Sequence, residues 1–305
     1  MDAKNVGIVG LGKMGKNIAL QMLGKGYGVI AYNRSPGPLE EVGANGAKKA
    51  GSLRELVNGM KQGNRIIWVM LTAGGPTIEI IREIAGYCGN GDIIIDGSNS
   101  YYKESVVLHE ELKRNGIAYL DAGCSGGPSG ALNGMCIMVG GDKEAFDSVE
   151  PLFRDLSVKN GYMYTGRPGS GHFTKMVHNA IEYGMMQSIG EGFDLLENGP
   201  FSGDLDISGL AGLWKNGSVI RGYLMELAEK ALEGDRHLDD VAPYVEDTGE
   251  GRWSVKEAID YGIPFNAISG SLYERFNSRS QKRFADRVIA ALRHEFGGHR
   301  IKNDD

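Results

Sequence analysis

The chain has 305 residues, enough for two domains that each bury a hydrophobic core. Its 41% hydrophobic and 24% charged content is ordinary for a soluble protein, and no stretch reaches the roughly 18 consecutive apolar residues of a membrane span. The net charge of −6 argues against general binding to the nucleic-acid backbone. A local cationic pocket for a small anion remains compatible with that charge.

Short apolar runs alternate with helical patterns in the first half of the chain. The predicted strands, rich in β-branched residues, cover 6–10, 28–33, 65–71, 92–98, 117–123, 134–142 and 161–166. The predicted helices, with apolar residues three and four apart, cover 16–26, 52–60, 77–88 and 104–116. Such strands, separated by helices, indicate a parallel sheet covered on both faces. We therefore predict an α/β Rossmann-like doubly wound domain over residues 1–165.

The second half of the chain has a different pattern. Strand signals end near Arg167, and helical patterns follow at 172–197, 219–233, 254–261 and 265–296, with a polar loop over 234–252. We predict an all-α C-terminal domain over 166–305.

A glycine motif, GLGKMG at 10–15, follows the first strand directly and precedes a helix, which is the context that dinucleotide binding requires. Gly10 permits the tight turn, Gly12 lets a pyrophosphate approach the backbone, and Gly15 allows the helix to pack closely. We predict that this turn, including Leu11 and Met14, binds a nicotinamide dinucleotide. A glycine-rich turn without a ligand is the alternative.

The end of the second strand bears on the choice of cofactor. A strict NAD site has an acidic residue here, whereas this chain has Asn33, Arg34 and Ser35. Asn33 removes a charge that would repel a 2′-phosphate, and Arg34 and Ser35 can bind one. The sequence thus favours NADP, with NAD as the alternative, since Arg34 can also stack on the adenine.

The three cysteines, Cys88, Cys124 and Cys136, match neither a metal-ligand spacing nor a disulfide framework. We also expect no signal peptide before the first strand. We therefore expect a cytoplasmic protein without a metal site.

The helical segment KMVHNAIEYGMMQ at 175–187 carries the most distinctive polar pattern. At about 100° per residue, Lys175, His178, Asn179 and Glu182 share one strip of the helix. A buried amine and carboxylate are costly unless they pair or take part in chemistry. The alternatives are a structural ion pair and a catalytic pair.

The apolar residues of the same segment favour burial of this helix. They are Met176, Ile181, Met185 and Met186.

Two loops follow predicted strand ends, where doubly wound sheets present ligands. One covers 96–102 and the other 121–131. In the second, Ser125, Gly126 and Gly127 can offer a hydroxyl and backbone N–H groups to a carboxylate. Either loop can also be a simple connector.

Taken together, these motifs resemble 6-phosphogluconate dehydrogenase, the decarboxylating enzyme of the pentose phosphate pathway. The elements that carry the resemblance are GLGKMG, IIDGSNS, the SGG loop, GSGHFTKMVHNAIEYGMMQ, GRW at 251–253, YERF at 273–276 and RHEFGGH at 293–299. They extend over essentially the whole chain, which resembles the short form of that family.

The resemblance implies a role for each matching residue. Lys175 matches the base that takes the C3 hydroxyl proton, and Glu182 matches the acid that protonates the enediol after loss of CO₂. The substrate-binding matches are Asn99, Ser125, Gly126, Gly127, His178, Asn179, Tyr183, Arg252, Arg275, Arg293 and His299. Arg293 and His299 resemble tail residues that reach a neighbouring subunit, which implies a homodimer or homotetramer.

The chemistry of a lysine base agrees with this pattern. Such a base must be uncharged near neutral pH, a state that burial and neighbouring cations favour. Arg252, Arg275 and Arg293 are expected to supply those cations and to bind a phosphate.

The chain also departs from the family pattern. Arg252 replaces a usual lysine, PSG replaces an acidic pair after SGG, and Tyr101 replaces an acidic residue. A β-hydroxyacid dehydrogenase acting on a non-phosphorylated acid is the alternative enzyme, and a non-catalytic dinucleotide-sensing protein is the alternative outside catalysis.

Overall fold

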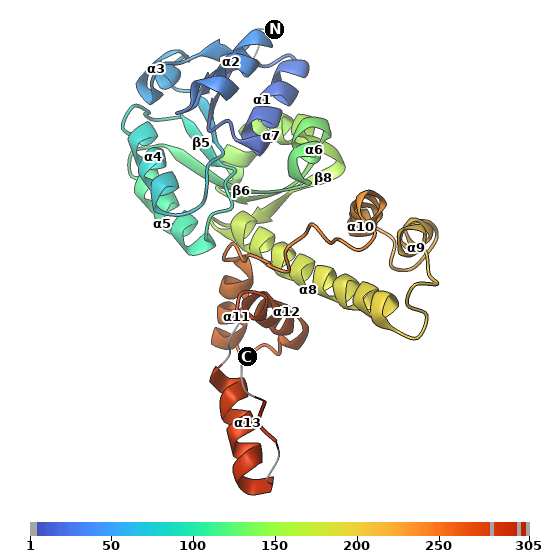
Figure 1. Ribbon diagram of the computed structural model, residues 1–305. Helices are drawn as coiled ribbons and strands as arrows, with labels where there is room; N and C mark the ends of the chain where they lie inside the picture. The colour runs from blue at the N-terminus through green and yellow to red at the C-terminus, as the bar shows by residue number, and fades with distance from the viewer. Residues whose placement is uncertain (1–4, 281–283, 298–299, 303–305) are drawn as a thin grey trace. The chain divides into compact units, whose positions relative to one another are not determined.

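A computed structural model describes residues 5–280, 284–297 and 300–302 of the chain. It divides into two compact units, Met1–His178 and Asn179–Asp305. The division falls inside one uninterrupted helix, α8 (Ser170–Asn198), which is labelled in Figure 1. The boundary predicted at 165 lies where the strands end, before that helix begins.

Within the described residues, the first unit holds one eight-stranded sheet of order β3-β2-β1-β4-β5-β6-β7-β8. Its strands are β1 (Asn5–Val9), β2 (Gly28–Tyr32), β3 (Lys48–Lys49), β4 (Ile66–Val69), β5 (Ile93–Asp96), β6 (Ala118–Ser125), β7 (Met135–Gly141) and β8 (Ser157–Gly166). Buried β-branched residues set the register, so that Val6 lies opposite Val29 on β2 and Ile66 on β4. The doubly wound fold predicted from the sequence is confirmed.

One strand departs from the predicted parallel sheet. Strands β1 to β6 pair in parallel, but β7 runs antiparallel to β6, and β8 then runs parallel to β7. The connection at 126–134 is the physical reason, because a parallel crossover needs about a dozen residues or more.

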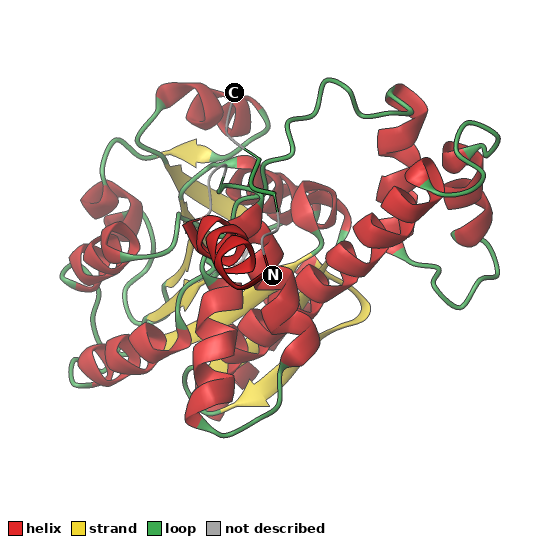
Figure 2. Ribbon diagram, turned by 60° about the horizontal axis from the view of Figure 1, so that its bottom comes forward, coloured by secondary structure: helices red, strands yellow, loops and turns green. Residues whose placement is uncertain are grey.

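Helices cover both faces of the sheet and bury two apolar cores. One core is formed with α1 (Lys13–Gly24), α2 (Pro36–Ala44), α6 (Gly127–Asn133) and α7 (Lys143–Leu156). The other core is formed with α3 (Leu53–Asn58), α4 (Gly75–Ala85) and α5 (Tyr102–Lys113). Figure 1 shows the two groups on opposite sides of the strands, and Figure 2 shows the yellow strands flanked by helices. This arrangement leaves the carboxyl ends of the strands as the edge from which loops project.

The second unit contains the rest of α8 and further helices. These are α9 (Ile207–Trp214), α10 (Tyr223–Gly234), α11 (Glu250–Asp260), α12 (Asn266–Asn277) and α13 (Phe284–Gly297). A small core at α9 and α10 is built from Ile207, Ala211, Met225 and Leu232. No helix among the described residues has the length and apolar content to cross a bilayer.

Four helices and one two-residue strand of the described chain were missed by the sequence analysis. They are α2, α6, α7, α9 and β3. Proline at the first helical positions begins both α2 and α6, where its missing N–H costs nothing. The loop predicted over 121–131 is therefore wrong, because it is the end of β6 followed by α6.

The helix pattern predicted over 265–296 is two helices, α12 and α13, rather than one. At the end of α12 the hydroxyl of Ser278 donates to the carbonyl oxygen of Arg275 at 2.8 Å and accepts from the Val245 N–H at 3.0 Å. A serine hydroxyl that bonds backbone groups in this way favours a helix end over continuation.

Candidate functional site

The glycine turn after β1 has the shape of a dinucleotide site. Gly10 has φ +92°, and a Cβ placed on it would lie 2.3 Å from the carbonyl oxygen of Met70. A Cβ on Gly15 would lie 1.9 Å from the Gly10 carbonyl oxygen, so this position also excludes a side chain. Nothing lies within 4 Å of a Cβ on Gly12, which leaves open space above the N-terminus of α1. The turn therefore fits the approach of a pyrophosphate.

Asn33 ties the end of β2 to this turn. Its Oδ1 accepts the Leu11 N–H at 2.9 Å, and its Nδ2 donates to the Ser35 carbonyl oxygen at 2.8 Å. Arg34 and Ser35 are exposed at the start of α2, and Met14 is half-buried. Of the predicted cofactor residues, Arg34 thus has the accessible charge that a 2′-phosphate would need.

A second cofactor-side loop was missed by the sequence analysis. The strand order reverses between β1 and β4, and doubly wound sheets bind ligands at such a switch point. The chain at 70–75 follows β4 there, packs against Gly10 through Met70, and is held by the Ser98 hydroxyl, which accepts the Leu71 N–H at 3.1 Å. Two glycines directly before Pro76 are the sequence feature from which this loop could have been predicted.

The N-terminus of α8 is anchored on β6 by a buried carboxylate. Asp121 accepts the Gly169 N–H at 2.8 Å and the His172 N–H at 2.9 Å, so it caps a helix that is distant in sequence. Burial raises the pKa of Asp121, and the neighbouring His172 opposes that rise. The helix start is thereby fixed at the carboxyl edge of the sheet.

His172 links the same helix to the loop after β5. Its Nε2 lies 3.1 Å from the Asp96 carbonyl oxygen and its Nδ1 lies 2.7 Å from the Ser105 hydroxyl. Because a carbonyl oxygen only accepts, Nε2 carries a hydrogen. The Asp96 carboxylate in turn accepts from the Ser98 N–H and from the hydroxyls of Ser100 and Tyr119. These bonds hold the 97–101 loop, which contains the predicted residue Asn99.

Lys175 follows one turn after His172 and is buried, with 8% of its surface exposed. A Cβ on Gly123 of β6 would lie 2.3 Å from the Lys175 Cβ, so a glycine is needed at this contact. His178 Nε2 lies 3.2 Å from the Ser125 hydroxyl at the end of β6. Gly126 and Gly127 follow at the start of α6 with φ values of +120° and +60°. The first unit therefore joins the predicted serine–glycine segment to the predicted catalytic helix.

In the second unit, a bonded group forms around the continuation of α8. Asn179 Nδ2 donates to Glu250 Oε1 at 3.0 Å, and the Thr248 hydroxyl donates to Glu250 Oε2 at 2.6 Å. The Tyr183 hydroxyl oxygen lies 3.3 Å from both the Thr248 hydroxyl and the Thr248 N–H. Thr248 and Glu250 were not predicted, because their 71-residue and 65-residue separations from Asn179 and Tyr183 leave no local pattern.

Glu182 is half-buried on the same helix, seven residues after Lys175. That spacing puts both on one side of a helix, about 10 Å apart along its axis.

Burial was predicted for the whole segment at 175–187. The prediction is right for Met176 but wrong for Ile181 and Met185, whose surfaces are 50% and 52% exposed in the single chain.

The predicted arginines divide between two arrangements. Arg252 forms two bonds of 2.8 and 3.0 Å to the Asp247 carboxylate, and Arg279 adds a third of 2.9 Å. These partners lower the pKa of Asp247. The Arg275 guanidinium lies 3.5 Å from the centre of the Tyr183 ring and donates to the Glu246 carbonyl oxygen. Arg275 thus lies beside a predicted substrate residue, whereas Arg252 is committed to a carboxylate.

Arg293 is exposed on α13, and His299 lies outside the described residues. Their predicted contact with a neighbouring subunit stays a prediction.

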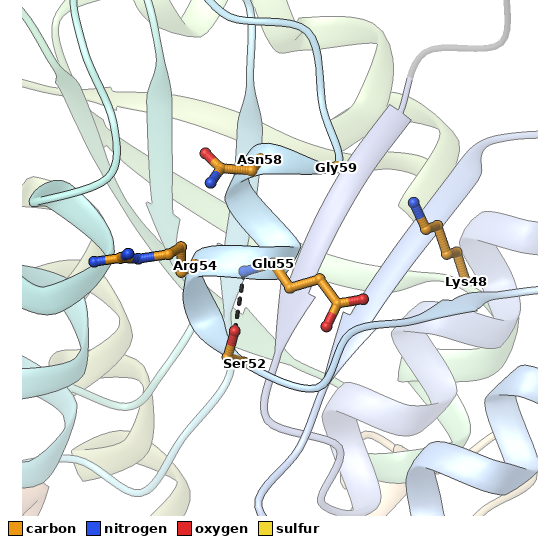
Figure 3. Close-up of a pocket in the computed structure, with 6 residues that line it drawn as sticks. All are labelled: Lys48, Ser52, Arg54, Glu55, Asn58 and Gly59. Atoms are coloured by element: carbon orange, nitrogen blue, oxygen red, sulfur yellow. Dashed lines mark hydrogen bonds between the residues drawn. The ribbon is translucent and has the colours of Figure 1, made fainter.

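One hollow of the described chain lies apart from the predicted site residues. A hollow of about 380 Å³ beside β3 and α3 is lined by Lys48, Ser52, Arg54, Glu55, Asn58 and Gly59, and Figure 3 shows it. None of these residues belongs to the predicted site. Among the described residues, no group of three histidine, cysteine or acidic side chains is placed to hold a metal ion.

Two family models match the chain. The NAD binding domain of 6-phosphogluconate dehydrogenase matches residues 5–166, and the C-terminal domain of 6-phosphogluconate dehydrogenase matches residues 171–303.

Individual relatives agree with these matches. The "6-phosphogluconate dehydrogenase, NAD(+)-dependent, decarboxylating" of Haloferax volcanii is 39% identical over 302 residues, covering 98% of this chain and 99% of that protein. The Bacillus subtilis protein YqeC, named as a candidate 6-phosphogluconate dehydrogenase, is 46% identical over 294 residues, covering 96% and 98%.

Solved structures add two comparisons. A Plasmodium falciparum 6-phosphogluconate dehydrogenase, solved with NADP⁺ and with 6-phosphogluconate, superposes with a TM-score of 0.82 at 30% identity over 98% of this chain and 66% of that one. A Mycobacterium tuberculosis 3-hydroxyisobutyrate dehydrogenase matches with a TM-score of 0.69 at 19% identity over 95% and 99%, which shows a common fold only.

Proposed function

Because the chain belongs to the 6-phosphogluconate dehydrogenase family, we propose that it oxidatively decarboxylates 6-phosphogluconate to ribulose 5-phosphate and CO₂, with reduction of a nicotinamide dinucleotide. The observation that carries this proposal is that Lys175 and Glu182 lie seven residues apart in α8, a spacing that puts both on one side of a helix. Lys175 is buried at the sheet edge, next to the segment that ends in Ser125.

The cofactor is held by the turn at 10–15, the end of β2 and the loop at 70–75. A bound nicotinamide would supply the oxidant for the reaction, as the acceptor of a hydride from substrate C3. Gly12 leaves space for the pyrophosphate, and exposed Arg34 and Ser35 offer a charge and a hydroxyl to a 2′-phosphate. These features favour NADP, with NAD as the alternative.

Lys175 acts as the base in the oxidation. It takes the proton of the C3 hydroxyl, so that the C3–O bond becomes a carbonyl as the C3–H bond breaks. The product is a β-keto acid, whose C1–C2 bond then breaks to release CO₂ and leave an enediol. Lys175, now protonated, stabilises the developing enolate oxygen.

Glu182 acts as the acid that completes the reaction. It gives a proton to the enediol carbon that becomes C1 of ribulose 5-phosphate. The helical spacing of about 10 Å, two turns, lets an amine and a carboxyl approach a substrate from the same side of the helix.

The remaining predicted residues bind the substrate. Asn99, Ser125, Gly126, Gly127 and His178 bind near the reacting carbons in this proposal. Asn179, Tyr183 and Arg275 bind the more distant part, and Arg275 is a suitable partner for the phosphate. Arg252 is a less suitable phosphate ligand, since two of its N–H donors already bind the Asp247 carboxylate.

The proposed assembly is a cytoplasmic homodimer or homotetramer. Three free cysteines are compatible with a reducing compartment. Many large apolar side chains of the helical unit are exposed in the single chain, among them Ile181, Met185 and Leu195. Such a surface favours association.

Initial rates with 6-phosphogluconate and each oxidised cofactor, run in parallel with CO₂ detection, test the proposal. Reduced cofactor and CO₂ are expected in equal amounts, faster with NADP⁺ at low concentration. Gluconate and 3-hydroxyisobutyrate are the comparison substrates. Faster turnover of either would replace this function with that of a general β-hydroxyacid dehydrogenase.

Replacement of the base is the sharper test. A Lys175→Met variant should lose at least about a thousandfold in kcat, because both removal of the C3 hydroxyl proton and stabilisation of the enolate oxygen depend on the amine. Cofactor binding, measured by fluorescence titration, should be unchanged. Full turnover by this variant would refute the assignment of Lys175.

A further inference from the structure

Glu250 is a buried acid to which the proposed mechanism gives no part. It is the first residue of α11 and only 2% of its surface is exposed. Its two carboxylate oxygens accept from different side chains, Oε1 from Asn179 and Oε2 from Thr248. A buried carboxylate with this pattern has a role in fixing the groups that point at it.

The hydrogen positions in this group follow from the acceptor-only character of a carboxylate. The Thr248 hydroxyl must give its hydrogen to Glu250, so it can only accept from the Tyr183 hydroxyl. The Tyr183 oxygen also accepts the Thr248 N–H. Hydrogen bonds therefore run from Tyr183 through Thr248 to Glu250, and separately from Asn179 to Glu250.

Two further contacts hold the tyrosine ring. Arg275 lies over one face at 3.5 Å from the ring centre. A Cβ on Gly251 would lie 2.8 Å from Tyr183 Cε2, so the ring packs directly on the backbone of α11. With its hydroxyl bonded and its ring enclosed, Tyr183 has one orientation.

Glu250 also decides the orientation of Asn179. An amide has a donor end and an acceptor end, and only the Nδ2 end can face a carboxylate. The charge of Glu250 thus selects one of the two flipped states of this side chain.

We propose that Glu250 is a positioning residue for substrate binding, which sets the amide of Asn179 directly and the hydroxyl of Tyr183 through Thr248. This inference rests on the proposed function, in which Asn179 and Tyr183 bind 6-phosphogluconate. Glu250 itself touches neither the substrate nor the cofactor in this scheme.

The substitution Glu250→Gln tests the proposal with almost no change of shape. A glutamine has one acceptor end and one donor end, so it can satisfy only one of the two incoming donors. Either the Asn179 amide must flip so that its oxygen faces the glutamine, or the Thr248 hydroxyl must accept a hydrogen from the glutamine instead of donating one. We expect KM for 6-phosphogluconate to rise about tenfold or more while kcat changes less than about threefold, because uniform binding is lost. KM for the cofactor should stay unchanged.

Two variants of Thr248 separate positioning from general stability. Thr248→Ser keeps the hydroxyl and should retain the wild-type KM, whereas Thr248→Val removes it and should raise KM. Glu257→Gln is the matched control, since Glu257 is a buried acid on the same helix. It is expected to leave KM unchanged even if the melting temperature falls.

Calorimetric binding of 6-phosphogluconate keeps this test distinct from the test of the proposed function. If wild-type protein binds and converts 6-phosphogluconate but Glu250→Gln shows the same Kd and KM, Glu250 has no positioning role. Equal losses of kcat and kcat/KM in Glu250→Gln, with a fall in melting temperature like that of Glu257→Gln, would also overturn the inference. Wild-type protein that neither binds nor converts the compound would overturn both proposals together.

Discussion

Single atoms decide how closely the proposed base can approach the sheet. The first turns of α8 pack on β6 and β7 at glycines, and a Cβ on Gly123, Gly140 or Gly171 would lie within 2.7 Å of a neighbouring atom. At Gly123 that atom is the Lys175 Cβ itself. The close packing of Lys175 on β6 thus depends on the absence of a side chain at Gly123.

A Gly123→Ala variant should therefore lower kcat by more than its loss of folding stability would explain. The added methyl must displace Lys175, and a shift of about 1 Å in a catalytic group can cost roughly a hundredfold in rate. We expect kcat to fall by about that factor, measured under saturating substrate. Gly24→Ala is the control, because nothing lies within 4 Å of a Cβ there. Equal kcat values for the two variants would show that the contact does not position Lys175.

A buried carboxylate, that of Asp247, anchors the end of the segment that leads from α10 to α11. Asp247 has a side chain only 2% exposed and bonds Arg252 from α11 and Arg279 after α12. Arg252 and Arg279 also lie over the ring of Phe276. This element holds the segment at 246–248 from which Thr248 reaches Tyr183.

The same carboxylate gives a pH-dependent contribution to stability. Bonds to Arg252 and Arg279 lower the pKa of Asp247 below its ordinary 3.8. A folded pKa below the unfolded one means that the stabilisation is complete above about pH 4 and is lost as the pH falls through the folded value.

Asp247→Asn should therefore lower the free energy of unfolding at pH 7 by about 1 kcal/mol, a small value because both arginines are partly exposed. Urea unfolding between about pH 7 and pH 3 measures the difference from wild type. That difference should shrink below pH 4, where the wild-type carboxylate takes up a proton. A difference that is constant over the whole range would exclude an ionic origin.

At the scale of the whole molecule, the two units differ in how much apolar surface they leave uncovered. Of the large hydrophobic side chains that are exposed among the described residues, most belong to the second unit, including Val288, Ile289 and Leu292 on α13. Its core at α9 and α10 is small. A surface of this kind is typical of a subunit interface.

We expect light scattering after gel filtration to give a dimer or tetramer. A double substitution Ile289→Glu and Leu292→Glu should shift the protein toward monomer, because it places charges in an apolar contact. If Arg293 reaches a neighbouring site as proposed, kcat/KM for 6-phosphogluconate should fall at least about tenfold in that monomer. A fully active monomer would contradict the proposed role of Arg293.

The amino-acid sequence alone determined the fold class, the positions of most strands along the chain and the glycine turn after β1, because these depend on local patterns. The three isoleucines at 93–95 are all β-branched, and the glycines at 10–15 follow their strand directly. The helical strip from Lys175 to Glu182 is equally local, since its spacing is that of a single helix. The family resemblance assigned chemistry to this strip.

Only the tertiary structure decided which distant groups meet. Asp121 caps a helix that begins about fifty residues later, and Glu250 bonds Asn179 across 71 residues. Arg252 matched a motif, yet a neighbouring aspartate holds it. Each of these outcomes depends on the competition among all possible partners for a buried donor or acceptor. The packing of distant segments decides which partner is bound, and no local pattern of residues predicts that choice.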